Sequence, residues 1–395
     1  MSYFHWITGC ILGLIWFERL AEAAFGMGKI PDVSSPQWNR KLVTPNGNPR
    51  VSVIVPACNE ADNIEQTLLQ LLILDYDNYE IIAVDDRSTD RTGAIMDQIA
   101  ATAEPKQRLK VIHVDELPSG WMGKTHAMWT ASLQADGEWL LFTDADVLFK
   151  PDALRRALAC AETEGADHLV MFPYMIMKRP GEKMMIAFFQ MLFVFGHRPW
   201  KVADPDTKDH MGVGAFNLIR RPVYDAIGTY ERLRMEVLDD MKLGKVVKNA
   251  GYAQRTAFGG DLISIRWARG AMGVVRNLTK NFFCAHVVPV AASASVLPGA
   301  GIPESDALHR SCIGAWPGPT ALCGGDARNV LDLCGHVAEV SDSPVLFPSP
   351  SHQHGSVCLY HAAFDAFDPR TRGSSLAGNV LSAGRVEEGN GVAWG

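Results

Sequence analysis

Short apolar runs alternate with helical segments over the first half of the chain, and this alternation restricts the fold more than any other feature. Residues 51–55 form a β-branched run that stops at Pro56, and residues 63–72 then carry apolar side chains at helical spacing. The order repeats, with strands expected at 79–86, 109–115 and 138–146 and helices at 92–101, 124–134 and from 151. This pattern predicts an α/β fold with a mostly parallel sheet flanked by helices.

Polar residues gather at the ends of three expected strands. They are Asn59 and Glu60, Asp85 and Asp86, and Asp144 and Asp146. Ligands of open parallel sheets bind beyond the carboxyl ends of the strands, and buried carboxylates are costly unless a cation or donor meets them. A D-x-D turn suits Mg²⁺ or Mn²⁺, which a nucleotide-sugar diphosphate would share. An isolated D-x-D is often only a helix cap, so its place at a strand end carries this interpretation.

Four stretches together resemble a known family. They read "VSVIVPACNEADNI", "IIAVDDRSTDRT", "LPSGWMGKTHAMWTASLQADGEWLLFTDADV" and "VLDDMKLG". They lie within residues 51–283 and resemble the family 2 glycosyltransferases, which have the GT-A nucleotide-diphospho-sugar transferase fold. Within that family the sequence is most similar to membrane-associated enzymes that glycosylate lipids such as ceramide, carotenoids and hopanoids. The resemblance implies an inverting hexosyltransferase that moves a sugar from a nucleotide-diphospho-sugar to a lipid hydroxyl.

The resemblance also implies roles for individual residues. Positions that bind the nucleotide sugar correspond to Pro56, Glu60, Asp85, Asp86, Lys124 and Asp144. The metal ligands correspond to Asp146, as the direct ligand, and to Asp144, which also lies nearer the sugar and ribose. Asp240 corresponds to the general base, with Asp239 as the alternative; such a base takes a proton from the acceptor hydroxyl while diphosphate departs on the other side.

One departure from the family pattern bears on the product. Processive glycan synthases carry Q/R-x-x-R-W, whereas this chain reads "ISIRW" with Ile263 at the first position. A single transfer is therefore favoured over a processive polysaccharide synthase, and Arg266 and Trp267 remain candidates for contact with diphosphate or acceptor. A catalytically inactive nucleotide-sugar-binding protein is a second alternative. A nucleotidyltransferase would need a glycine-rich basic loop where "PACNEADN" is acidic.

The N-terminal segment raises the question of a membrane. Residues 3–17 are almost wholly apolar, but a helix of that length spans about 22 Å, less than the roughly 30 Å hydrocarbon core. A membrane anchor over residues 1–24 is preferred to a cleaved signal peptide or a buried helix. Basic residues follow the segment and none precedes it, which predicts a cytoplasmic catalytic domain at residues 51–265 after a linker at 25–50.

Two later segments also favour contact with a membrane. From 266 to 283, basic residues (Arg266, Arg269, Arg276 and Lys280) fall on one helical face and apolar residues on another, which predicts an interfacial amphipathic helix. Residues 184–195 are mostly apolar but too short to span a bilayer, so core packing remains an alternative there. The net charge of −7 disfavours nucleic acid as a partner, and the eight cysteines lack zinc-site spacing and suit reduced cytosolic thiols.

Residues 284–395 differ from the rest of the chain in composition. They contain no Lys and no Met, yet hold five of the eight Cys and six of the twelve His. Their apolar residues follow neither helical nor strand spacing, where relatives usually continue into membrane helices. We consider an unusual disordered extension or a change of reading frame near Phe283, and the composition favours the second. Either interpretation predicts a poorly structured tail.

Overall fold

The computed structural model describes residues 2–40, 47–104 and 108–282. Its centre is a seven-stranded sheet with the order β3-β2-β1-β4-β8-β6-β9. The strands are β1 Val51–Ala57, β2 Tyr79–Asp86, β3 Leu109–Val114, β4 Trp139–Phe142, β6 His168–Phe172, β8 Asn217–Arg220 and β9 Gln254–Phe258. All neighbouring pairs are parallel except those that β8 forms with β4 and β6. The predicted α/β fold with a mostly parallel sheet is confirmed.

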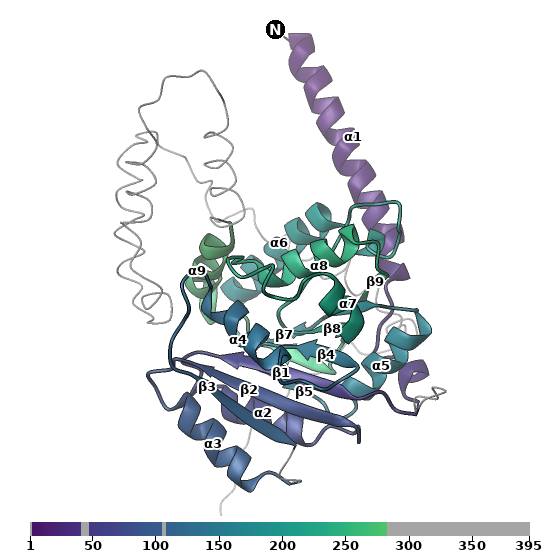
Figure 1. Ribbon diagram of the computed structural model, residues 1–395. Coiled ribbons are helices and arrows are strands. Elements are labelled where there is room, and N and C mark those ends of the chain that lie inside the picture. Colours follow the sequence, from purple (N-terminus) through teal and green to yellow (C-terminus); the bar gives the residue numbers. More distant parts are fainter. Residues whose placement is uncertain (1, 41–46, 105–107, 283–395) are drawn as a thin grey trace, which may run out of the picture. The chain divides into compact units, whose positions relative to one another are not determined.

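Helices cover both faces of this sheet (Figure 1). One layer consists of α2 Ile64–Leu72, α3 Thr92–Thr102 and α5 Ala153–Thr163, and the other of α4 Gly123–Ser132, α7 Arg221–Ala226 and α8 Asp239–Asn249. Because both faces are buried, β1 is a continuous apolar run: Val53 packs into one layer and Ile54 into the other. The direction of strand order reverses between β1 and β4, which is where open α/β sheets hold their ligands.

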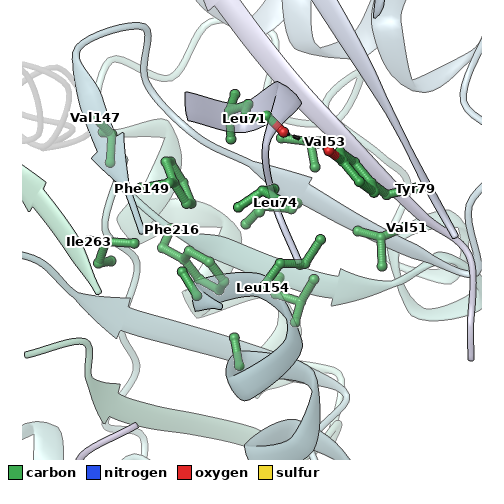
Figure 2. Packing of buried hydrophobic residues seen from close by; sticks show 14 of the residues in the cluster. Val51, Val53, Leu71, Leu74, Tyr79, Val147, Phe149, Leu154, Phe216 and Ile263 are labelled. Atoms are coloured by element: carbon green, nitrogen blue, oxygen red, sulfur yellow. Dashed lines mark hydrogen bonds between the residues drawn. The ribbon is translucent and has the colours of Figure 1, made fainter. Parts of the chain in front are cut away.

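The larger core lies between the sheet and the α2, α3 and α5 layer. Figure 2 shows it closing around side chains from distant segments, among them Leu71, Phe149 and Phe216. The Tyr79 hydroxyl donates a 2.8 Å hydrogen bond to the Leu71 carbonyl, so its polar atom is satisfied inside the core. Each such large side chain contributes about 1.5–3 kcal/mol through burial, which makes the strands a rigid platform for their carboxyl ends.

A second, three-stranded sheet follows the D-x-D segment. It consists of β5 Val147–Phe149, β10 Ile263–Ile265 and β7 Tyr174–Met175, with β10 in the middle. Two further helices, α6 Pro180–His197 and α9 Gly270–Phe282, pack on each other around Ile186, Ala268 and Val274. The helix expected from Arg266 therefore begins at Gly270, whose positive φ of 75° marks the turn into it.

The N-terminal helix α1 spans Ser2–Gly26. Its second half is attached to the rest by an ion pair of 2.5 Å between Glu22 and Lys201, and by an edge-to-face contact of Trp16 with Phe195. Within the described residues, no helix combines the length and the hydropathy that crossing a bilayer requires. The structure thus does not confirm the expected membrane span.

Part of the segment expected to be a linker packs on the domain. Two short 3₁₀ helices, Met27–Lys29 and Pro36–Trp38, lie within it. Val33 donates a backbone hydrogen bond of 2.8 Å to Phe258, and both Val33 and Trp38 are buried. An isolated parallel bridge of Asp32 with Phe258 therefore adds to the edge of the sheet at the end of β9. The predictions made for residues 284–395 fall outside the described residues.

Candidate active site

The loop after β1 carries the first candidate residues. Pro56 lies beyond the part of β1 that pairs with β4, so its missing N–H interrupts no ladder on that side. Asn59 adopts a positive φ of 57°, which Asn tolerates better than most residues, and its side-chain oxygen accepts hydrogen bonds from the loop after β2. Glu60 receives a hydrogen bond from Asn63 at 2.8 Å, yet burial raises the pKa of Glu60.

Asp85 and Asp86 end β2, and both have hydrogen-bond donors. The Asp85 carboxylate accepts from the Ser88 backbone N–H at 3.3 Å and lies 3.2 Å from His113 Nδ1. Asp86 is only 3% exposed and is held by Arg87 through contacts of 2.8 and 3.1 Å. The acids expected to bind the nucleoside are therefore paired before any ligand arrives.

Asp144 and Asp146 lie between β4 and β5, where the main sheet leads into the small one. The Asp144 backbone N–H donates to the Gly214 carbonyl at 3.0 Å, which attaches the D-x-D turn to the segment before β8. Burial raises the pKa of Asp146 to about 7, and the neighbouring charges of Asp144 and Glu60 act in the same direction. Three acids at the rim thus repel one another.

Lys124 connects the D-x-D turn to α8. Its ammonium lies 2.7 Å from Asp144 Oδ1 and 3.6 Å from Asp239 Oδ1. Burial alone would lower the pKa of Lys124, but the attraction of Asp144 and Asp239 raises it instead. The lysine that the sequence places at the start of a helix is therefore a charged bridge between two candidate acids.

Asp239 and Asp240 begin α8 but have different surroundings. Asp239 is 5% exposed, and burial raises its pKa to about 7 although Lys124 opposes the shift. Asp240 instead accepts two backbone hydrogen bonds, from Gly214 at 2.9 Å and from Met241 at 2.7 Å. Backbone hydrogen bonds thus orient Asp240, whereas Asp239 forms an ion pair with Lys124.

Gly214 is a site residue that sequence reasoning missed. Its N–H binds Asp240, its carbonyl binds the Asp144 backbone, and a Cβ at this position would lie 2.3 Å from Asp144 Oδ2. A Cβ on Gly212 would likewise meet the Asp240 backbone at 1.8 Å. The G-x-G in "MGVGAFN" was the available signal, because glycine permits close approach of the backbone.

The carboxylates of the D-x-D turn fit a divalent metal that is also bound by a diphosphate ligand. Among residues 2–40, 47–104 and 108–282, no group of three or more His, Cys, Asp or Glu side chains is placed to hold an ion. Burial, and next the charges of Asp144 and Glu60, nevertheless raise the pKa of Asp146, and a cation bound there would act in the opposite direction. Mg²⁺ is commonly bound by one or two carboxylates, with phosphate oxygens and water completing its shell, so the chemistry of Asp144 and Asp146 fits such an ion.

Arg266 and Trp267 are not joined to the acidic cluster by any ion pair or ring contact in the described part of the chain. Trp267 stacks on Phe189 of α6, with ring centroids 5.1 Å apart and planes 11° from parallel. The Nε of Arg266 is buried and has no hydrogen-bond partner among the described residues. A buried N–H without a partner is costly, so this guanidinium is suited to an additional anionic ligand.

The sequence is similar to several curated proteins. The chain is similar to 4,4'-diaponeurosporenoate glycosyltransferase of Staphylococcus aureus (strain MRSA252), with 28% identity over 196 residues that make up 49% of this chain and 50% of that protein. Proteins of the same name from strains USA300 and NCTC 8325 match equally well. The chain spans about half the length of these curated relatives.

The chain is also similar to two solved structures and to one protein-family model. A mannosyltransferase from Pyrobaculum calidifontis in complex with GDP-Man and Mn²⁺ is 23% identical, with a TM-score of 0.47 over 89% of this chain and 92% of that one. S. aureus TarS is 21% identical, with a TM-score of 0.39 over 55% and 36%. The family model described as Glycosyl transferase family 2 matches residues 52–228. Residues 52–228 are therefore similar to family 2 glycosyltransferases.

Proposed function

We propose that the protein is an inverting glycosyltransferase that moves a sugar from a nucleotide-diphospho-sugar to a lipid hydroxyl at a membrane. The observation that carries the proposal is the linked set at the rim of the sheet. Lys124 contacts Asp144 and Asp239, and Gly214 links the backbone of Asp144 to the carboxylate of Asp240. One cation and three acids are thereby gathered where the D-x-D turn meets α8, and group transfer needs such opposed charges.

The donor would lie across the ends of β1, β2 and β4. Glu60 follows β1, Asp85 and Asp86 end β2, and all three would face the nucleoside. Asp144 and Lys124 would lie nearer the diphosphate and sugar, and Arg266 supplies a buried guanidinium N–H that is otherwise unsatisfied. This placement follows the rule that open α/β sheets bind ligands where the strand order reverses.

Asp146 and Asp144 would hold a divalent metal, Mg²⁺ or Mn²⁺. A metal bound there would neutralise charge on the departing diphosphate. Burial, and next the charges of Asp144 and Glu60, raise the pKa of Asp146, and the same ion would stabilise both carboxylates against these effects.

Asp240 is the proposed general base. Its two oxygens already accept backbone hydrogen bonds, which orient the carboxylate but leave lone pairs for the acceptor hydroxyl. Asp240 takes the hydroxyl proton as the acceptor oxygen bonds to the anomeric carbon, and the bond to the diphosphate breaks on the opposite side. Asp239, which Lys124 engages, positions that lysine.

The lipid acceptor and the membrane are supported by a relative and by surface chemistry. The curated relative is named for a carotenoid acid. On α6 the exposed Met184, Phe188 and Leu192 recur at every fourth position. On α9 the exposed Met272 and Val275 accompany Arg276, and the exposed Arg269 directly precedes this helix. Apolar side chains bordered by basic ones suit an anionic cytoplasmic leaflet, against which the catalytic domain would lie.

The alternatives predict different products. Ile263 is fully buried and pairs with Phe149, so the position that is polar in processive synthases belongs here to the core. We therefore favour a single transfer over a polysaccharide synthase. An inactive nucleotide-sugar-binding protein would bind donor but release no nucleoside diphosphate.

The test is release of nucleoside diphosphate from UDP-sugars and GDP-sugars in the presence of a lipid extract, with and without EDTA. We expect release that needs both the extract and the metal, together with a glycosylated lipid of increased mass. Donor binding without release would favour the inactive alternative, and a growing polymer would favour the processive one. Release without any dependence on lipid would contradict the acceptor assignment.

Membrane binding has its own test. Co-sedimentation of the wild type with vesicles of anionic and neutral lipid should show preference for the anionic ones. The double change Arg269→Gln and Arg276→Gln should weaken this binding, by about 1 kcal/mol for each basic residue near the surface. The matched control is Lys110→Gln with Lys245→Gln, which removes the same charge from exposed positions on β3 and α8. Equal losses in both pairs would contradict a specific membrane face.

A further inference from the structure

His113 lies between two carboxylates at the edge of the proposed nucleoside site. It is on β3, opposite Asp85 of the neighbouring β2, and its ring nitrogens face Asp85 Oδ2 at 3.2 Å and Asp97 Oδ1 of α3 at 3.0 Å. The side chain is 43% exposed, whereas that of Asp85 is 13% exposed. A solvent-accessible imidazole thus borders a largely enclosed carboxylate.

A neutral His113 ring has too few N–H donors for the two carboxylates that it contacts. A neutral imidazole has one N–H, but both of its charged neighbours, Asp85 from β2 and Asp97 from α3, are acceptors. Only the imidazolium donates to both. Its hydrogen bond to Asp97, and next that to Asp85, raise the pKa of His113 above 6.5, against the effect of burial.

Contacts other than the one with His113 also restrict the orientation of the Asp85 carboxylate. One oxygen accepts from the Ser88 N–H, and a Cβ on Gly93 would lie 2.3 Å from the other. Helix α3 therefore closes one side of the carboxylate, and His113 is the side-chain donor that holds the oxygen facing α3. The lone pairs that remain determine which hydrogen-bond donors Asp85 can accept from a ligand.

We propose that His113 is a positioning residue that orients the Asp85 carboxylate so that it accepts a ring N–H from the nucleobase of the donor. This inference rests on the proposed function, because it assumes that a nucleotide binds beside Asp85. An ionised, fixed carboxylate only accepts hydrogen bonds, so it favours uracil or guanine, which present a ring N–H, over cytosine or adenine, which present a ring acceptor there.

The inference has a definite pH dependence. Because the pKa of His113 is raised, the contribution of the imidazolium is complete below about 6.5 and is lost as the pH rises through the higher pKa of the folded protein. Nucleotide affinity should therefore fall as the pH rises through that pKa. The second phosphate ionisation of a nucleoside diphosphate contributes a pH effect as well, and it must be separated by a variant that lacks the imidazole.

The experiment is calorimetric binding of UDP and of GDP to the full-length protein from about pH 5.5 to 8.5, the range in which His titrates. His113→Ala should weaken the nucleotide that the wild type prefers by about tenfold, since a charge-assisted hydrogen bond to Asp85 is lost. In His113→Asn the carboxamide N–H can occupy the place of Nδ1, so affinity should recover while the imidazole-dependent part of the pH profile disappears. Asp97→Asn should retain binding but move the alkaline loss to lower pH.

Several outcomes would overturn the inference. Binding by His113→Ala that equals the wild type at every pH would exclude the positioning role and leave the proposed function intact. Loss of binding in His113→Asn as severe as in His113→Ala, with normal thermal unfolding, would point to packing rather than hydrogen bonding. If the wild type bound neither UDP nor GDP, the inference and the proposed function would fail together. If His113→Ala does not fold, His113→Asn and Asp97→Asn decide the question through their pH profiles.

Discussion

The rim of the site has two halves, one at the end of β2 and one around the D-x-D turn and α8, and the carboxylates of the two halves have different surroundings. At the end of β2, Asp85 and Asp86 each have donors in place, from His113 and Ser88 and from Arg87. Around the D-x-D turn and α8, burial instead raises the pKa of Asp146 and of Asp239 to about 7. In the half of the rim proposed to bind the nucleoside, the two acids of β2 thus have donors in place, whereas the half proposed to carry out the transfer contains buried carboxylates with raised pKa values.

The raised pKa of Asp146 gives the size of the difference between the two halves. A shift of the Asp146 pKa from 3.8 to about 7 corresponds to unfavourable interactions on the order of 4 kcal/mol. Lys124 is one cation facing Asp144, Asp239 and, electrostatically, Asp240. A metal and a sugar diphosphate would bring the missing partners, so the transfer half gains most from ligands, and changes in it should have the larger effects.

The largest effect is expected for Asp146→Ala. The change removes the carboxylate with the raised pKa, so donor binding should lose its dependence on Mg²⁺ or Mn²⁺ and weaken by more than about 100-fold in the presence of metal. Titration of UDP-sugar or GDP-sugar with and without EDTA measures this. Unfolding of the metal-free variant should be no easier than that of the wild type, because a poorly compensated buried charge is lost. Unchanged metal dependence would mean that Asp146 is not the ligand.

Asp240→Asn should follow in size. It keeps the shape of the side chain but removes the proton acceptor, so kcat should fall by about 10² or more while donor affinity is largely kept. The companion variant Asp239→Asn, which disturbs Lys124 instead, should mainly raise KM for the donor. Near-normal turnover in Asp240→Asn together with loss in Asp239→Asn would transfer the catalytic role by one residue.

Gly214→Ala tests whether the two acids of the transfer half are mechanically linked. The added carbon would lie 2.3 Å from Asp144 Oδ2, so the carboxylate must move. We expect a loss of stability of about 1–3 kcal/mol and roughly tenfold lower kcat/KM. Gly196→Ala is the matched control, because nothing lies within 4 Å of the carbon it adds. Equal activity of both variants would show that Asp144 tolerates displacement.

The smallest effect is expected in the nucleoside half. The Asn59 side-chain oxygen accepts from Thr89 N–H at 2.8 Å and Asp90 N–H at 3.3 Å, which joins the loops after β1 and β2. Asn59→Ala should weaken nucleotide binding only a few-fold, since each lost hydrogen bond is worth about 1 kcal/mol. Asn59→Asp keeps the acceptors and the tolerance of positive φ, so it should bind more tightly than the alanine variant. A loss as large as that of Asp146→Ala would contradict the division of the rim into two halves.

Local pattern was sufficient for the fold and for much of the rim. The β-branched runs and the helical spacing predicted β1 to β4 and α2 to α5 within a few residues, because both periods record burial directly. The spacing was less informative at Arg266, where the helix begins only at Gly270, since residues of the preceding loop happen to continue the amphipathic pattern. The segment expected to be a linker also holds two buried apolar side chains, Val33 and Trp38, whose packing local composition does not indicate.

The sequence by itself determined the α/β class, the acids at the strand ends and the similarity to family 2 glycosyltransferases, because short stretches of neighbouring residues carry each of them. The tertiary structure alone decided how those acids are coupled. The contact of Lys124 with Asp239, the hydrogen bond of Gly214 to Asp240 and the approach of His113 to Asp85 all join residues that are far apart in the chain. Which acid receives a cation, and which remains buried with a raised pKa, depends on these long-range contacts. Desolvation and Coulomb interactions act through distance in space, which residue order along the chain does not specify.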